Sequence, residues 1–322
     1  MLSLRYFDGE LWAIGRREAG FYFKFGWHHS VVALVRIAEV VNIYKFGCDR
    51  MTTVVPLTLF LINSQAHSPR LAISRAESWV VATKSRLYIL LPPSEGKALL
   101  GLPNTKWRES DGTFGKSLAE QRTEIVEALT AAGGGSQKLL GVSGNHLARA
   151  QRANISLCGA PTLPAWERYT GVVWDQLDIS SLPSVARTLA QTNILIVSGL
   201  LGLVTASDPI PDYRLKIGAS LAPLGKLSKW WRKDISRVLN KHCAGCTVID
   251  LLPQEHFAAY EPDEAMLGTY LRVGLETKGG ATGGHDAKAV KGRLARHLIV
   301  NSKDPHAALK SFNDPRFRVH IR

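Results

Sequence analysis

A serine and a lysine follow the first clear apolar strand of this chain, in a loop whose residue types suit the binding of an anion. The strand is expected at residues 87–91, and the polar loop that leaves it contains Ser94 and Lys97. A hydroxyl and an ammonium at the carboxyl end of a strand are typical of ligand sites in open α/β sheets. The loop therefore predicts a ligand site, and the plain alternative is a solvated polar connection.

The same loop matches the S-x-x-K pattern of serine penicillin-binding enzymes. Residues 143–145 and 278–280 imitate the two other elements of that pattern. Those enzymes place the serine at the start of a helix and work outside the cytoplasm, whereas Ser94 leaves a strand. We therefore rank acyl-enzyme chemistry below a solvated loop.

A glycine-containing turn is expected between two helices at residues 139–149. Its glycines would expose backbone N–H groups, which hold DNA phosphates in helix-hairpin-helix modules. A glycine connection between packed helices is also common for structural reasons alone. In the binding interpretation, the contacting residues are Gly141, Val142, Gly144, Asn145, Arg149 and Arg152.

Two expected helices, residues 226–242 and 287–300, are strongly basic. In the second, Lys288 and Lys291 are three residues apart and can share a face. A solvated charged face is the ordinary explanation for either helix alone. The whole chain, however, has 40 Lys and Arg against 27 Asp and Glu, a formal charge of +13. This excess favours a polyanionic partner, a nucleic acid or another phosphate-rich ligand.

Cys243 and Cys246, with His242 and His256 nearby, have a spacing that could bind a metal or cycle between thiol and disulfide. A second cysteine pair is missing, and the two cysteines are expected at the end of a helix and the start of a strand. Two half-buried thiols are the better interpretation. We expect no metal and no cofactor.

The elements that position these residues alternate along the chain. Strands are expected at residues 87–91, 193–197 and 247–251, and a helix at 118–132 with Ser117 as its N-cap. Further helices are expected at residues 146–153 and 166–177. This order predicts an α/β fold, with a mixed sheet flanked by helices.

Residues 1–86 differ from the rest, with aromatic clusters such as residues 21–25 and no sustained periodicity. We expect an N-terminal extension at 1–86, disordered or produced by a mis-assigned start, and an α/β domain at 87–322. The mainly apolar stretch 54–62 is well short of the ~20 residues that a membrane-spanning helix needs. Four cysteines in so long a chain fit a reducing compartment, so we expect a cytoplasmic protein without membrane contact.

From Leu87 onward the chain resembles the YaaA family, bacterial proteins associated with peroxide stress. The resemblance covers most of residues 87–319. It is carried by four blocks, at residues 90–97, 197–218, 250–257 and 287–296. One block departs from the family: where a pattern Asn-Leu-x-Ser-x-Glu-Tyr is frequent, this chain loses the hydroxyl and carries His256.

The resemblance implies a helix-hairpin-helix element, a positively charged cleft, binding of double-stranded DNA, and a role in limiting free intracellular iron. The cleft would be lined by Ser94, Lys97, Tyr213, Arg214, Lys288 and Lys291. The plain alternative for Arg214 is an ion pair with a nearby acid such as Asp208.

This family role favours a non-catalytic protein. The alternative is an enzyme that acts on a nucleotide or nucleic-acid base in the same pocket. Such an enzyme would need a depressed pKa at Lys97 or Lys288, with proton transfer by Ser94, Glu255 or His256.

The first 86 residues are expected to be dispensable for folding, because the first strand and every family block lie downstream. A protein of residues 87–322 should keep a cooperative thermal transition in circular dichroism, with a melting temperature close to that of the full chain. A large fall in melting temperature would show that the extension belongs to the core.

Overall fold

The computed structural model describes residues 86–279 and 284–321, together with the backbone of five short strands nearer the N-terminus. The chain divides into two units, residues 1–83 and 84–322, and each is considered by itself. The first unit contains β1 Leu2–Phe7, β2 Glu10–Gly15, β3 Lys24–Phe25, β4 Ala33–Val35 and β5 Leu59–Leu61. The rest of residues 1–85 lies outside the described residues, so a disordered or mis-assigned extension stays a prediction.

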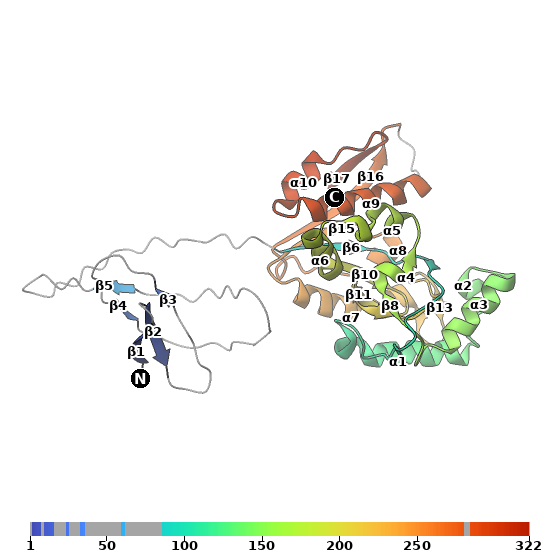
Figure 1. The fold of residues 1–322 in the computed structure, drawn as a ribbon. Coiled ribbons are helices and arrows are strands. Elements are labelled where there is room, and N and C mark those ends of the chain that lie inside the picture. The colour runs from blue at the N-terminus through green and yellow to red at the C-terminus, as the bar shows by residue number, and fades with distance from the viewer. Residues whose placement is uncertain are drawn as a thin grey trace, which may run out of the picture. The chain divides into compact units, whose positions relative to one another are not determined.

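A six-stranded mixed sheet forms the centre of the second unit, in the order β11-β10-β6-β15-β16-β17 (Figure 1). Four neighbouring strands are parallel: β10 Ile194–Ser198, β6 Leu87–Leu91, β15 Thr247–Asp250 and β16 Thr269–Thr277. The edge strands β11 Gly202–Thr205 and β17 Phe317–Ile321 are antiparallel to their neighbours. Every residue of β6, β10 and β15 is buried, which explains why these strands read as apolar runs in the sequence.

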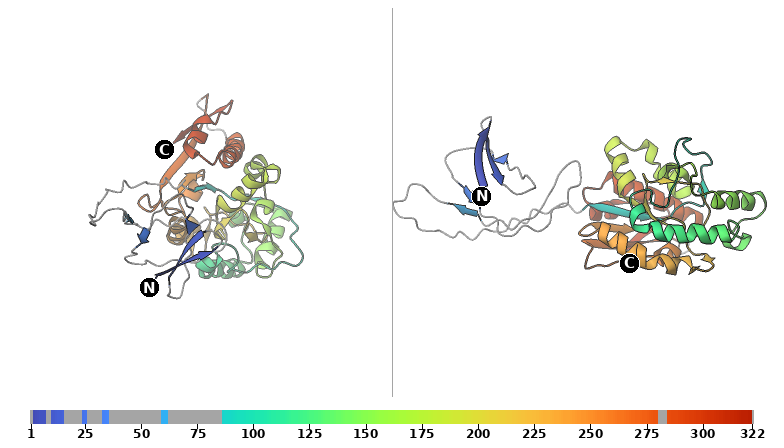
Figure 2. Two further views of the ribbon diagram at one scale, coloured as in Figure 1. Left: turned by 60° about the vertical axis from the view of Figure 1, so that its left-hand side comes forward. Right: turned by 90° about the horizontal axis from the view of Figure 1, so that it is seen from below.

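Helices flank the sheet, as the sequence predicts, so the α/β fold with a mixed sheet is confirmed. They are α1 Gly115–Ala131, α2 Gln137–Leu140, α3 Gly144–Ile155, α4 Ala165–Arg168, α5 Val172–Leu177, α6 Ser184–Asn193, α7 Leu227–His242, α8 Gln254–Phe257, α9 Gly284–Val300 and α10 Pro305–Ser311, with a 3-10 turn at Ile179–Ser181. In Figure 1 and the left view of Figure 2, α9 and α10 lie at one end with β16 and β17. Helices α1, α2 and α3 lie at the other end.

Two helix predictions are wrong in detail. The helix expected at 166–177 is broken into α4 and α5, because Gly171 between them has φ 142°, which no helix adopts. The first long helix starts at Gly115 and not after Ser117, since its N-cap is Phe114 and no side chain caps it.

Short two-stranded pairs fasten the loops around the sheet. They are β7 Gly96–Lys97 with β9 Tyr169–Thr170, β8 Leu163–Pro164 with β12 Pro209–Ile210, and β13 Ser220–Leu221 with β14 Gly225–Lys226. The first pair ties the loop after β6 to the segment before α5.

The topology places a switch point between β6 and β15. The chain leaves β6 toward β10 on one side of the sheet, and it leaves β15 toward β16 on the other side. In open α/β sheets the crevice at such a point, outside the carboxyl ends of the strands, is where ligands bind.

A buried arginine joins α1 to the sheet. The Arg122 side chain is 1% exposed and donates to the backbone carbonyls of Leu201, Leu203, Glu109 and Asp111 at 2.8–3.2 Å. It thereby holds the loop before α1 against the β10–β11 turn.

Replacing this arginine should be costly, because Arg122→Met leaves four carbonyl groups without their donor in a closed site. We expect the free energy of unfolding to fall by about 3 kcal/mol in urea denaturation. The exposed neighbour on the same helix supplies the control, since Lys116→Met should change stability by less than about 0.5 kcal/mol. Equal effects of the two substitutions would contradict this account.

Candidate functional site

A cavity of about 1010 Å³ opens at the carboxyl ends of β6 and β15. Its walls are the loop after β6, the segment leading into α5, the strap of residues 213–217, the start of α8, and α9. All six residues expected to share one cleft line it: Ser94, Lys97, Tyr213, Arg214, Lys288 and Lys291. The fold thus brings together side chains that are nearly 200 residues apart in the chain.

Lys97 lies in the floor of the cavity and is 9% exposed. Its Nζ donates to the Ser94 carbonyl at 2.8 Å and lies over the Tyr213 ring, 4.1 Å from the ring centre. Burial lowers the pKa of Lys97 to about 7. Asp212 and Glu95 raise this pKa, while Arg214 and Arg149 lower it further. A lysine with this surrounding is in part an uncharged amine at neutral pH.

The hydroxyl of Tyr213 belongs to a buried chain of hydroxyl groups. It lies 2.7 Å from the Tyr169 hydroxyl and 2.7 Å from that of Ser198. Burial raises the pKa of Tyr213 to about 12, so the phenol stays protonated. The strap can pass this close to β10 because Gly199 has no side chain: a Cβ there would lie 2.8 Å from the Ile217 nitrogen.

Glu95 neutralises two cationic side chains of the strap on the exposed side of the cavity. Its two carboxylate oxygens contact Arg214 Nη2 at 2.5 Å and Lys216 Nζ at 3.0 Å. Burial by itself would raise the pKa of Glu95, but Lys216 and Arg214 outweigh it and lower that pKa. Glu95 and Lys216 were not singled out from the sequence, although both stand inside the blocks that carry the family resemblance.

Arg214 has a different partner from the acid suggested by the sequence. The alternative of an ion pair with a nearby acid is confirmed, but the acid is Glu95. Asp208 was the wrong example, because its carboxylate accepts from Thr113 and from the Thr205 amide. Arg214 instead uses Nε to donate to the Leu140 carbonyl at 3.0 Å and Nη2 to reach Glu95. An incoming anion must therefore compete with Glu95 for this guanidinium.

On the opposite wall, Lys291 lies against the end of β15. Its Nζ donates to the Leu251 carbonyl at 2.6 Å. Burial lowers the pKa of Lys291 to about 8, which the Asp250 carboxylate partly opposes. Burial also lowers the pKa of His256 to about 4, and Lys291 adds to the shift, so this imidazole is neutral. Lys288, one turn before Lys291, is exposed.

The glycine-containing turn expected between two helices lies between α2 and α3, beside the strap, and a helix-hairpin-helix function for it stays a prediction. The turn between α2 and α3 has Gly141 at φ 63° and Gly144 at φ 54°, values that favour glycine. Asn154 of α3 donates to the Arg214 carbonyl at 2.9 Å and accepts from the Arg214 amide at 2.9 Å. Arg149 pairs with Asp212 at 2.9 Å. The turn and α3 carry Gly141, Val142, Gly144, Asn145, Arg149 and Arg152, and α2 is a single helical turn.

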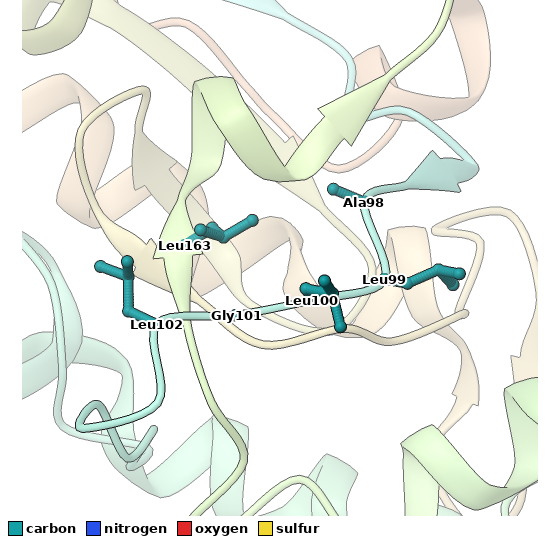
Figure 3. Close-up of a pocket in the computed structure, with 6 residues that line it drawn as sticks. All are labelled: Ala98, Leu99, Leu100, Gly101, Leu102 and Leu163. Carbon is teal, nitrogen blue, oxygen red and sulfur yellow. The ribbon is translucent and has the colours of Figure 1, made fainter.

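A second, apolar hollow lies along the loop after β7 (Figure 3). Its lining is Ala98, Leu99, Leu100, Gly101, Leu102 and Leu163. The buried Arg168 fixes this loop by donating to the carbonyls of Ala98 and Leu100 at 2.6 and 3.1 Å. Its lining has no polar side chain, so the hollow is unsuited to phosphate, and nothing in the sequence pattern indicated it.

The cysteines and the basic helix α7 stand apart from the cavity lining. Cys243 is a buried free thiol whose pKa is raised by burial, and Cys246 is also free. Among the described residues, no cluster of three or more His, Cys, Asp or Glu side chains is arranged to hold a metal ion. No helix within this part of the chain is both long and apolar enough to cross a membrane.

These features define a class: an α/β protein with a lysine-lined cavity at the switch point of a mixed sheet. Residues 87–321 match the family described as peroxide stress protein YaaA, and the chain belongs to that family. A UPF0246 protein of Streptomyces coelicolor is 34% identical over 223 residues, which cover 68% of this chain and 85% of the relative. One of Corynebacterium glutamicum is 33% identical over 239 residues, covering 69% and 89%.

The buried Lys97 should leave a signature in the pH dependence of stability. Between about pH 7 and 10.5 the unfolded chain keeps the Lys97 proton and the folded protein does not, so the free energy of unfolding rises with pH. Below pH 7 both states hold the proton and this contribution is constant. From pH 7 to 9, wild type should gain up to about 1.4 kcal/mol per pH unit relative to Lys97→Met, measured by urea unfolding.

The exposed Lys310, on α10, provides the control, because Lys310→Met should follow the wild-type profile. Other titrating groups are present in all three proteins and cancel in the comparison. Parallel profiles for wild type and Lys97→Met would contradict a depressed pKa at this lysine.

Proposed function

We propose that this chain is a cytoplasmic peroxide-stress protein that binds double-stranded DNA through the α2–α3 hairpin and the cations of the cavity, and so helps to limit free intracellular iron. The role in peroxide stress is supported by the family to which the chain belongs. DNA binding and the limitation of iron are supported by the resemblance described above. The observation that carries DNA binding is the junction at Arg214, which contacts both the end of α2 and Glu95 in the cavity wall.

This junction supports one continuous binding surface. Arg152 and Asn145 are exposed on α3, and Arg214 and Lys216 line the cavity. Arg149 of α3 pairs with Asp212, next to the strap. Backbone N–H groups at the start of α3 add a site for a phosphate oxygen. Contacts of this kind position a duplex without reading its sequence.

The expected behaviour is sequence-independent binding that weakens steeply with salt. In fluorescence anisotropy with several labelled duplexes, Arg152→Gln should lower affinity on all of them and reduce the slope of log affinity against log salt by about 0.9, the value for one lost phosphate contact. Gly144→Val should weaken all duplexes alike, because valine disfavours the backbone at φ 54°.

The matched control is Arg318→Gln, which removes the same charge from an exposed position on β17. It should leave the salt slope within error of wild type. If Arg152→Gln and Gly144→Val bind duplex as wild type does while melting normally, the hairpin is a structural turn only.

A second function, an enzyme acting on a nucleotide or nucleic-acid base, is favoured by one observation. Lys97 offers a buried, partly uncharged amine inside a cavity whose size suits a small ligand. A turnover screen with nucleotides, nucleosides and damaged duplexes, comparing wild type with Lys97→Met, tests it. Product formation that the substitution abolishes would support the enzyme, and no turnover of any of these compounds would leave only the binding protein.

A further inference from the structure

We infer that Lys97 is a nucleophile that forms an imine with the carbonyl carbon of a phosphate-bearing aldehyde held in the cavity. This inference rests on the anion-binding role proposed above and names the chemistry of the ligand. An abasic deoxyribose within duplex DNA and a free sugar phosphate both supply an aldehyde beside a phosphate.

The surroundings of Lys97 keep its amine apart from carboxylates and fix its position. Lys97 is held by the Ser94 carbonyl at 2.8 Å and by the face of the Tyr213 ring. No carboxylate of the described residues lies within 4.0 Å of its Nζ, since Glu95 is engaged by Arg214 and Lys216 and Asp212 by Arg149. A lysine used only for charge is normally paired with a carboxylate or solvated. Lys97 is instead 9% exposed and contacts a backbone carbonyl and an aromatic ring.

The groups facing Lys97 account for its reactivity. Burial disfavours the ammonium, and Arg214 and Arg149 disfavour it further, while Asp212 and Glu95 act in the opposite direction. The Tyr169 and Tyr213 hydroxyls stay protonated and contribute no charge. Lysines desolvated beside other cations are the ones that attack carbonyl carbons in enzymes.

The reaction balances without any further reactant. The amine lone pair attacks the aldehyde carbon, a C–N bond forms, and the two amine hydrogens leave with the carbonyl oxygen as water. A proton taken from solvent converts the imine into an iminium with one remaining N–H. That N–H can keep the hydrogen bond that the Ser94 carbonyl already accepts.

The cavity also supplies cations that can bind the phosphate of the aldehyde. Arg214, Lys288 and Lys291 line it together with Lys97, and Arg214 can exchange Glu95 for a phosphate through its two-pronged fork. A volume of about 1010 Å³ accommodates a nucleotide-sized group. An aldehyde without a phosphate should therefore react poorly.

The test traps the imine with sodium cyanoborohydride in the full-length protein. One arm uses a duplex with a single abasic site, a second uses glyceraldehyde 3-phosphate, and a third uses glyceraldehyde. Peptide mass spectrometry maps the adducts from pH 6 to 9. At pH 7 roughly a thousandth or less of an ordinary lysine is uncharged, so Lys97 should carry at least about 10-fold more adduct than any other lysine in one of the phosphate arms. The yield from glyceraldehyde should be several-fold lower.

Adduct on Lys97 with the abasic duplex alone identifies damaged DNA as the source, and adduct with glyceraldehyde 3-phosphate alone identifies a free sugar phosphate; either supports the inference. Adduct spread over exposed lysines, or no adduct on Lys97 in either phosphate arm, overturns it. Equal yields from glyceraldehyde and its phosphate also overturn it. Mapping in wild type decides the matter even if Lys97→Met does not fold, and Lys310→Met should leave the Lys97 adduct unchanged.

Failure of this inference is distinct from failure of DNA binding. Salt-dependent duplex binding without a Lys97 adduct would contradict imine formation and support the DNA-binding function. A Lys97 adduct with glyceraldehyde 3-phosphate, in a protein that binds no duplex, would contradict the DNA-binding function and support imine formation.

Discussion

Gathering cations around one cavity is unfavourable unless carboxylates neutralise them, and this electrostatic constraint governs how the walls are built. Glu95 bridges Arg214 and Lys216, Asp212 holds Arg149, and Asp250 lies near Lys291 and Arg272. Each carboxylate comes from a different segment, so the pairs also connect the walls. Lys97 has no carboxylate among the described residues within ion-pair distance, and burial lowers its pKa, so it gives up part of its charge.

Sheet topology determines which segments face one another. Because β6 and β15 are parallel neighbours whose chains depart in opposite directions, their following loops open onto the same crevice. The strap fits above β10 only because Gly199 leaves room for it, and the strap then brings Tyr213 over Lys97. The packing of the backbone therefore determines the geometry of the site in this protein.

Lys97, which is buried, and Lys291, which is half-buried, differ in their surroundings, which suits different tasks. Lys291 donates to a backbone carbonyl near the Asp250 carboxylate, and its partial charge persists around neutral pH. Lys97 has an aromatic face and a carbonyl instead, and its amine is more readily uncharged. One lysine is thus suited to holding an anion and the other to attacking a carbon.

The central strands, the alternation of strands and helices, and the family could all be predicted from the amino-acid sequence, because buried parallel strands are mainly apolar and the family blocks are local. The sequence also named six residues of one cavity: the resemblance grouped all six, and the alternation of strands and helices predicted that Lys97, Arg214 and Lys288 would converge at the carboxyl edge of the sheet. The helix break at Gly171 was not predicted, because it depends on a backbone angle that local composition does not determine. The pairing of Arg214 with Glu95 in place of Asp208, and the burial of Lys97 against the Tyr213 ring, became visible only in the folded protein. Ion pairing and pKa depend on distances between segments far apart in the chain, and those distances exist only once the sheet has formed.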